Sequence, residues 1–199
     1  MKRIGMTGFL LIAAAALPAP AAVFNVADGD VAGLRSALQS ANDNSESDTI
    51  NLATDGTYTF IDTDGLTLTL ETAVRVRSGN QSLTINGNGS TLQRSDAPGT
   101  PNFRVVVIAS PATGQSVVVN DLTIRNGNVV DDHQARGAGI YVSNNTDRSS
   151  RGGEVQLNRC VVTGNQIADL PPSQGARGGG IYSEAVRLTV ADSQVTNNR

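Results

Sequence analysis

The feature that most constrains the fold of this chain is a pattern of three short strands that repeats from residue 74 onward. The first strand of each repeat is rich in Ile, Val and Tyr, and its copies are Val74–Val76, Val106–Ile108, Gly139–Tyr141 and Gly180–Tyr182. The steps from Val76 to Ile108, then to Ile140 and then to Ile181 are 32, 32 and 41 residues. One such repeat cannot bury its apolar face alone, so the copies are expected to stack on one another.

The second and third strands follow in the same order in every repeat. The second strands are Leu83–Ile85, Val117–Val119, Val155–Leu157 and Leu188–Val190, and the third strands are Thr91–Leu92, Leu122–Ile124, Cys160–Val162 and Ser193–Val195. The last repeat holds all three strands within the 22 residues 178–199. Longer repeats carry insertions at fixed points, namely 143–153 after the first strand, and 128–137 and 166–177 after the third. Insertions at fixed points predict loops that project from a stacked core.

Three strands in a repeat of this length form one turn of a three-sided coil, so the predicted fold class is an all-β parallel β-helix, or solenoid. Equivalent strands of successive coils would lie about 4.8 Å apart, with alternate residues pointing inward. We expect Ile108, Ile140 and Ile181 to form a single interior column, and Tyr141 and Tyr182 to form an outward ladder. The other residues expected inside are Leu157, Cys160, Val162, Val190, Ser193 and Val195.

The segment 31–42 has the period of a helix, in contrast to the rest of the mature chain. Its apolar face consists of Val31, Leu34, Ala37, Leu38 and Ala41. Asp30 is a suitable N-cap. We expect this short helix to cap the N-terminal end of the β-helix, because an open strand edge invites association. Further strands are predicted at 23–27, 49–52, 57–60 and 66–70.

Residues 1–22 have the pattern of a cleavable export signal. Lys2 and Arg3 precede an apolar run, which ends in a small-residue cleavage site at Ala19–Ala21. The run is too short to span a membrane, which takes about 20 residues, and no second apolar run follows. The predicted organisation is therefore a signal peptide at 1–22 and a β-helix domain at 23–199, in an exported protein without a transmembrane segment. Because the chain stops just after a third strand, we expect the domain to be the N-terminal part of a longer β-helix.

The charged residues argue against nucleic-acid binding, and the single cysteine argues against an internal disulfide or a cysteine-based zinc site. The formal net charge is −3, Lys2 is the only lysine, and the arginines are scattered, so nucleic acid is not an expected partner. Cys160 is the only cysteine, which leaves no internal disulfide or cysteine-based zinc site and favours a small buried residue.

The chain contains eight short motifs, namely Leu34-Arg35-Ser36-Ala37, Ala41-Asn42, Asp48-Thr49-Ile50, Gly56-Thr57-Tyr58, Gly137-Ala138-Gly139-Ile140, Gly178-Gly179-Gly180-Ile181, Val162-Thr163-Gly164-Asn165 and Val195-Thr196-Asn197-Asn198. They resemble motifs of secreted proteins of the pectin-lyase-like superfamily, in particular polymorphic outer-membrane-protein-like and CSLREA-type surface proteins. The chain departs from the family pattern where Ala32-Gly33 replaces Cys-Ser, Ser36 replaces Glu, and Val162 and Val195 replace Phe. The resemblance implies a right-handed parallel β-helix at the cell surface, and it implies little about activity.

The superfamily includes polysaccharide lyases and hydrolases, so a catalytic site has to be considered. The strongest candidate cluster is Asp131-Asp132-His133, since paired carboxylates can cleave glycosidic bonds. His133, however, is the only histidine, and it is not part of the Gly-His-Gly motif of pectin hydrolases. Asp121 and Asp192 occupy equivalent turns with Arg159 between them, which favours a surface ion pair over a calcium site. We predict no catalytic residue, no metal site and no cofactor.

These observations favour a non-catalytic scaffold that is secreted or attached to the outer cell surface and acts in adhesion. Its partner would be an extracellular polysaccharide or a host or matrix surface, contacted by the inserted loops. The candidate contact residues are Asp131, Asp132, Arg148 and Arg151. The alternative is a polysaccharide lyase or glycoside hydrolase that acts on an acidic polysaccharide.

Overall fold

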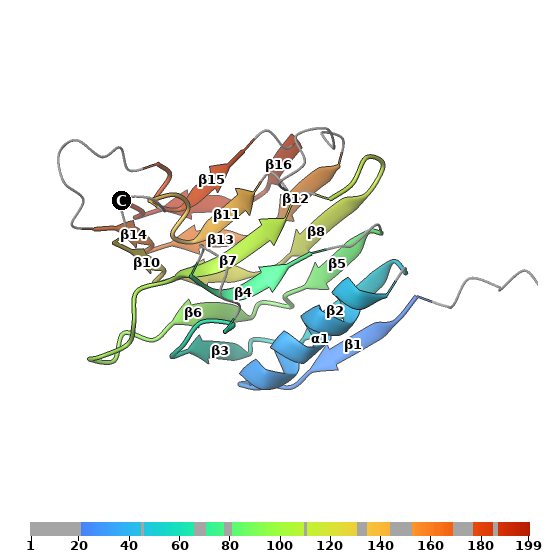
Figure 1. Cartoon of the computed structure of the whole chain (residues 1–199), viewed down its shortest axis with the longest axis horizontal. Helices are drawn as coiled ribbons and strands as arrows, with labels where there is room; N and C mark the ends of the chain where they lie inside the picture. The colour runs from blue at the N-terminus through green and yellow to red at the C-terminus, as the bar shows by residue number, and fades with distance from the viewer. Residues whose placement is uncertain are drawn as a thin grey trace, which may run out of the picture.

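The chain forms a parallel β-helix with one helix at its N-terminal end (Figure 1). The computed structural model describes residues 21–44, 46–65, 71–77, 81–109, 111–130, 135–143, 153–168, 177–184 and 187–199. The strand expected at 66–70 lies outside these residues. The predicted fold class is confirmed.

Three parallel sheets form the walls of the β-helix. Sheet A contains, in spatial order, β1 (Val23–Val26), β2 (Asp48–Leu52), β5 (Leu83–Asn86), β8 (Ser116–Asn120), β12 (Glu154–Asn158) and β16 (Arg187–Ala191). Sheet B contains β3 (Thr57–Phe60), β6 (Thr91–Arg94), β9 (Thr123–Arg125), β13 (Val161–Thr163) and β17 (Gln194–Thr196). Sheet C contains β4 (Thr72–Val76), β7 (Arg104–Ala109), β11 (Ile140–Ser143) and β15 (Ile181–Ser183). A two-stranded sheet D pairs β10 (Asn128–Val129) with β14 (Gln166–Ile167).

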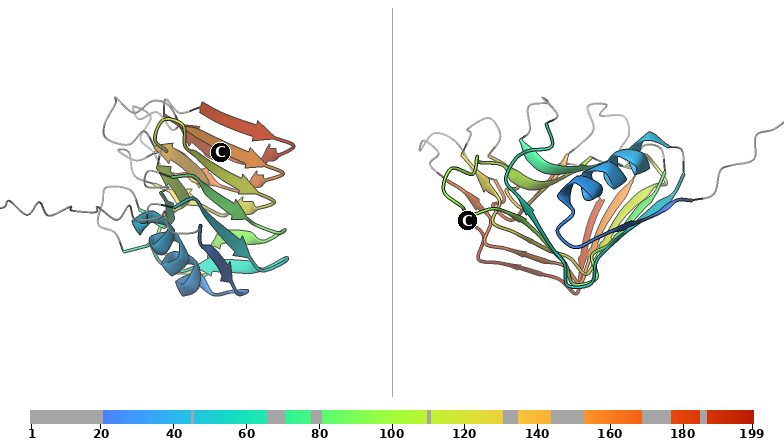
Figure 2. Two further views of the ribbon diagram at one scale, coloured as in Figure 1. Left: turned by 90° about the vertical axis from the view of Figure 1, so that its right-hand side faces the viewer. Right: turned by 90° about the horizontal axis from the view of Figure 1, so that it is seen from below.

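Each coil runs from sheet A through sheet B to sheet C and then begins the next strand of sheet A. Seen from the N-terminal end, the chain winds clockwise as it moves away from the viewer (right panel of Figure 2). The β-helix is therefore right-handed, as expected for crossovers between parallel strands.

The strand registers confirm most of the predicted stacking, with one correction. Ile140 lies opposite Ile181, but on its other side it lies opposite Val106, while Ile108 lies opposite Val142. The predicted single column of Ile108, Ile140 and Ile181 is therefore wrong, because Ile108 belongs to the neighbouring interior column. The run of apolar residues in β7 gives no period that could fix its register, so matching isoleucine to isoleucine moved the alignment by two residues.

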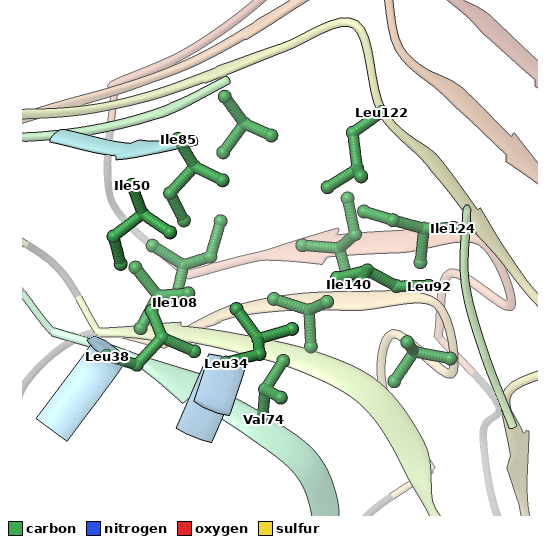
Figure 3. Packing of buried hydrophobic residues seen from close by; sticks show 14 of the residues in the cluster. Leu34, Leu38, Ile50, Val74, Ile85, Leu92, Ile108, Leu122, Ile124 and Ile140 are labelled. Carbon is green, nitrogen blue, oxygen red and sulfur yellow. The ribbon is translucent and has the colours of Figure 1, made fainter. Parts of the chain in front are cut away.

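Aliphatic side chains from all three sheets fill the interior (Figure 3). Cys160 is buried as predicted, and its burial raises the pKa of the thiol. Two residues expected inside are half-exposed: Val190 at 43% and Val195 at 49%. They stand in the predicted columns, opposite Leu157 and Val162, but β16 and β17 are the outermost strands of their sheets, so no further strand covers them.

The helix α1 (Val31–Asp43) covers the N-terminal end of the interior, as predicted (Figures 1 and 3). Asp30 caps it by accepting a hydrogen bond from the Gly33 amide at 2.8 Å. The buried side of α1 is formed by Leu34, Ala37, Leu38 and Ala41. Arg35 fastens the helix by donating to the carbonyl of Ala73 at 3.1 Å and pairing with Asp62 at 2.9 Å.

The corner between sheets A and B is regular. An outward ladder of asparagines marks the end of the sheet A strands, with side-chain hydrogen bonds of 2.9–3.0 Å that link Asn25, Asn51, Asn86, Asn120 and Asn158. The turns contain left-handed residues with φ between 51° and 53°, namely Asp55, Asn88, Asp121, Arg159 and Asp192. This conformation suits Asn and Asp, whereas Arg159 adopts it at a cost.

The corner between sheets B and C is built around buried asparagine. Asn165 is fully buried, and its Oδ1 accepts from the Gly127 amide at 2.8 Å. Its Nδ2 lies 3.2 Å from the carbonyl oxygen of Ile124 and 3.0 Å from Oδ1 of Asn198. A Cβ at Gly139 would lie 2.7 Å from Nδ2 of Asn165. The asparagine and glycine motifs of the repeat therefore form one packed unit.

Candidate functional site

The outer face of sheet C carries two stacked tyrosines. Tyr141 of β11 lies opposite Tyr182 of β15, with ring centroids 5.8 Å apart and an interplanar angle of 29°. The predicted outward ladder is confirmed. Tyr141 is buried and Tyr182 is partly exposed, so the ring of Tyr182 is the part of the stack that a ligand can reach.

Arginine side chains lie over both rings. The Cζ atom of Arg104 in β7 is 5.1 Å from the Tyr141 centroid, and that of Arg136 is 5.6 Å from the Tyr182 centroid. Both distances are within the range of cation–π contacts. Arg104 is 1% exposed and donates from Nη1 to the carbonyl of Arg136 at 2.9 Å. Burial lowers the pKa of Arg104 to about 10, so its guanidinium stays charged at neutral pH.

Glu184 links these groups from the end of β15. Its Oε1 pairs with Arg136, and its Oε2 accepts a hydrogen bond from the Tyr141 hydroxyl at 2.9 Å. Burial, followed by the contact with Glu184, raises the pKa of Tyr141. A tyrosine with a raised pKa stays protonated at neutral pH, so it does not act as a general base there. The cluster of Arg104, Arg136, Tyr141, Tyr182 and Glu184 is called the arginine–tyrosine stripe below.

A third arginine extends the stripe at its border with sheet B. Arg177 pairs with Arg136 through an isolated parallel bridge, so two residues of like charge lie in adjacent coils. Arg177 is exposed, whereas the charge of Arg136 is already balanced by Glu184. Arg177 is therefore the positive charge that a ligand can reach beside the stripe.

The four residues predicted to bind a partner lie outside the described residues. Asp131 and Asp132 belong to the segment between β10 and Arg136. Arg148 and Arg151 belong to the segment between β11 and β12, where the chain passes from sheet C to sheet A. The described residues that flank the two segments lie at opposite borders of sheet C, and the arginine–tyrosine stripe lies between these borders.

The ion pair predicted between adjacent coils is present at the corner of sheets A and B. Nε and Nη2 of Arg159 each lie 2.7 Å from a carboxylate oxygen of Asp121. This bidentate contact lowers the pKa of Asp121. Both oxygens of Asp121 already face Arg159, which fits an ion pair better than a calcium ligand.

The described residues hold no group of three or more His, Cys, Asp or Glu side chains that could bind a metal ion. Within this part of the chain, the two carboxyl groups with a resolved shift, Asp121 and Glu154, have lowered pKa values. A general acid requires the opposite shift. The stripe can thus recognise a ligand by charge and stacking, and its geometry does not supply an acid–base pair.

Sequence reasoning missed Arg104, Arg136 and Glu184. A signal for Arg136 was present, because Arg136-Gly137-Ala138-Gly139-Ile140-Tyr141 and Arg177-Gly178-Gly179-Gly180-Ile181-Tyr182 repeat the same arrangement. Arg104 stands at the start of an apolar strand, where a charged residue is unusual. Nothing in the sequence marks Glu184 as the residue that joins Arg136 to Tyr141.

Neither a family model, nor a curated protein, nor a solved structure matches the chain. The fold is therefore assigned from the strands and their registers. No helix within the described residues has the length and hydropathy needed to cross a membrane.

Proposed function

We propose that this protein is an exported scaffold of the outer cell surface or extracellular space that binds its partner without transforming it. The arginine–tyrosine stripe and the two loops at the borders of sheet C form the proposed contact surface. The observation that carries the proposal is Glu184, whose two carboxylate oxygens are both engaged, by Arg136 and by Tyr141. Arg104 and Tyr141 are buried, so the stripe and the neighbouring Arg177 offer a ligand the partly exposed ring of Tyr182 and one exposed positive charge, while the carboxylate of Glu184 is occupied.

An acidic extracellular polysaccharide is the proposed partner. Arg177 supplies an exposed positive charge beside the Arg136–Glu184 pair, and Tyr182, which is partly exposed, supplies a ring on which a sugar can stack. Export is supported by the signal-like residues 1–22, and membership of the pectin-lyase-like superfamily is supported by the repeat motifs quoted above. Both remain part of the proposal.

The experiment measures binding and cleavage together. The protein is titrated with polygalacturonate and alginate by calorimetry, and each mixture is then assayed for unsaturated and reducing sugar ends. We expect binding without new ends, and a loss of about tenfold or more in affinity when Arg177→Gln removes the exposed charge. Arg77→Gln, which removes an exposed arginine elsewhere, is the matched control. Equal affinity of the two variants would contradict the proposal.

The alternative is a polysaccharide lyase or glycoside hydrolase, and one observation favours it. Asp131 and Asp132 precede Arg136 by only a few residues, so two carboxyl groups are tethered to the border of the stripe. Release of new sugar ends that is abolished by Asp131→Ala or Asp132→Ala would establish this alternative and overturn the scaffold proposal.

A further inference from the structure

A buried carboxylate lies beside the start of β1. Asp48, the first residue of β2, is 3% exposed. Its Oδ1 accepts a hydrogen bond from the backbone amide of Ala22 at 2.8 Å, and its Oδ2 accepts one from Nδ2 of Asn44 at 2.7 Å. Asn44 is the C-cap of α1. Asp48 therefore joins the residue before β1 to the end of the cap helix.

Both donors to this carboxylate are neutral amides. Among the described residues, no cationic side chain forms an ion pair with Asp48. A carboxylate taken out of water is costly unless a cation or several hydrogen bonds replace the water. A positive charge beside Oδ1 of Asp48 would therefore stabilise the fold.

The backbone of Ala22 is held by two contacts with β2. Its nitrogen donates to Asp48, and its carbonyl oxygen accepts from the amide of Thr49 at 2.9 Å. These contacts continue the pairing of β1 with β2, in which Val23 lies opposite Thr49 (Figure 1). Ala21, by contrast, is exposed. The bond between Ala21 and Ala22 therefore joins an exposed residue to the hydrogen-bonded start of the sheet.

The same bond directly follows the small-residue motif of the export signal. Ala19 and Ala21 stand third and first before it, which is the A-x-A pattern at which a signal peptidase cuts. Hydrolysis breaks the C–N bond: the hydroxyl of water goes to the carbonyl carbon of Ala21, and the nitrogen of Ala22 takes up protons. The neutral amide thus becomes an α-ammonium group, and the boundary of the signal moves from residue 22 to residue 21.

We propose that the α-ammonium group formed by cleavage after Ala21 is the ion-pair partner of Asp48. The nitrogen of Ala22 already lies 2.8 Å from Oδ1, so the pair forms without movement of the backbone. It ties β1 to β2 and, through Asn44, to the cap helix. Removal of the signal thereby stabilises the N-terminal end of the β-helix. This pairing rests on the export part of the proposed function.

The first test identifies the new N-terminus. The full chain is expressed in a bacterial host that exports it, and the exported product is sequenced from its N-terminus. The expected first residue is Ala22. An exported product that begins at Val23 or at any other residue overturns this inference alone, because its amino group would not lie beside Asp48. A product that is not exported and retains Met1 overturns the export part of the proposed function as well.

The exported product also allows selective removal of the new charge. Lys2 is the only lysine and is lost with the signal, so the α-amino group is the only primary amine left. Acetylation of this group removes its charge, whereas reductive methylation keeps it. Both modifications are made in urea, and the products are refolded by dilution. Acetylation should lower the Tm by about 5 °C, because a charged hydrogen bond is lost. Methylation should lower the Tm much less, and equal shifts would overturn the proposal.

Asp48→Asn tests whether the charge acts on this carboxylate. Acetylation should change the Tm of this variant little, because the partner of the ammonium group is already gone. Asp96→Asn is the matched control, since it removes an exposed carboxylate between β6 and β7 and should leave the effect of acetylation unchanged. An equal effect of acetylation in Asp48→Asn and Asp96→Asn would overturn the proposal. If Asp48→Asn does not fold, the comparison of the acetylated and methylated parent protein decides.

Discussion

The corner between sheets A and B and the corner between sheets B and C differ in length and in where they place asparagine. In successive coils the first corner takes four, four, two, two and two residues, whereas the second takes 11, 9, 14 and 17 residues. At the first corner the asparagines form a ladder on the outer surface, and at the second Asn165 is fully buried. The short corner keeps successive coils in register, while the long corner tolerates insertions because buried asparagine and glycine hold its base. The candidate stripe begins at the long corner.

The largest expected loss of stability comes from adding a methyl group at Gly139, which packs against Asn165. A Cβ at Gly139 would lie 2.6 Å from the carbonyl oxygen of Gly180 and 2.7 Å from Nδ2 of Asn165, so backbone would have to move. Gly139→Ala should lower the free energy of unfolding by about 3 kcal/mol, at the upper end of the cost of overpacking. Urea denaturation measures the change.

The matched control is Gly89→Ala at the corner of sheets A and B. Its Cβ would meet the side chain of Asp55, which can move away, so the strain of the left-handed backbone remains as a cost of about 1–2 kcal/mol. If the two variants lost equal stability, the contrast between the corners would be unsupported.

Removal of the buried side-chain amide of Asn165 should give the next largest loss of stability. Asn165→Ala leaves the Gly127 amide and the Ile124 carbonyl without their partner in a fully buried position. The expected loss is about 2–3 kcal/mol, measured by the same denaturation experiment. A loss near zero would mean that water replaces the asparagine.

The equivalent change in the outer ladder should cost less. Asn120 donates to Asn86 and accepts from Asn158, both at 3.0 Å, but it is only partly buried. Asn120→Ala should therefore cost about 1 kcal/mol, since water can satisfy the groups left behind. A loss as large as that of Asn165→Ala would show that the ladder holds the coils together more strongly than exposure suggests.

The smallest effect is expected at the exposed ion pair. Arg159 lowers the pKa of Asp121, so the pair contributes fully above the ordinary pKa of an aspartate and is lost as the pH falls through the lowered value. Arg159→Gln should raise the pKa of Asp121 towards its ordinary value, as measured by carboxyl ¹³C NMR, with little change in stability. An unchanged pKa would show that the ion pair does not form in solution.

The sequence was sufficient to predict the strands and the cap because their periods differ. Ile50 and Leu52 alternate with polar residues, whereas Leu34 and Leu38 follow the helical period, and both sets are buried as this requires. The register of β7 was not predictable in this way, since its interior and exterior positions are both apolar. Prediction failed there for a physical reason, which is that burial on both faces removes the alternation.

The candidate site was less accessible to sequence analysis than the fold. Tyr141 and Tyr182 occupy equivalent positions in the repeat, so their stacking could be predicted. Arg104 and Glu184 reach Tyr141 from two different coils, and sequence spacing does not encode a contact that depends on side-chain direction. The candidate contact residues Asp131, Asp132, Arg148 and Arg151 lie in insertions of the repeat, so the repeat does not predict where they lie in the structure.

The pattern of backbone nuclear Overhauser effects between strands of sheet A tests the parallel β-helix most directly. Parallel stacking in register predicts contacts that link Val119 to Leu157 and Leu157 to Val190, from β8 through β12 to β16. It also predicts that the short contacts between opposing Hα atoms, which mark antiparallel pairs, are missing between these strands. Opposing Hα contacts, or links displaced by one residue, would contradict the β-helix and the surfaces inferred from it.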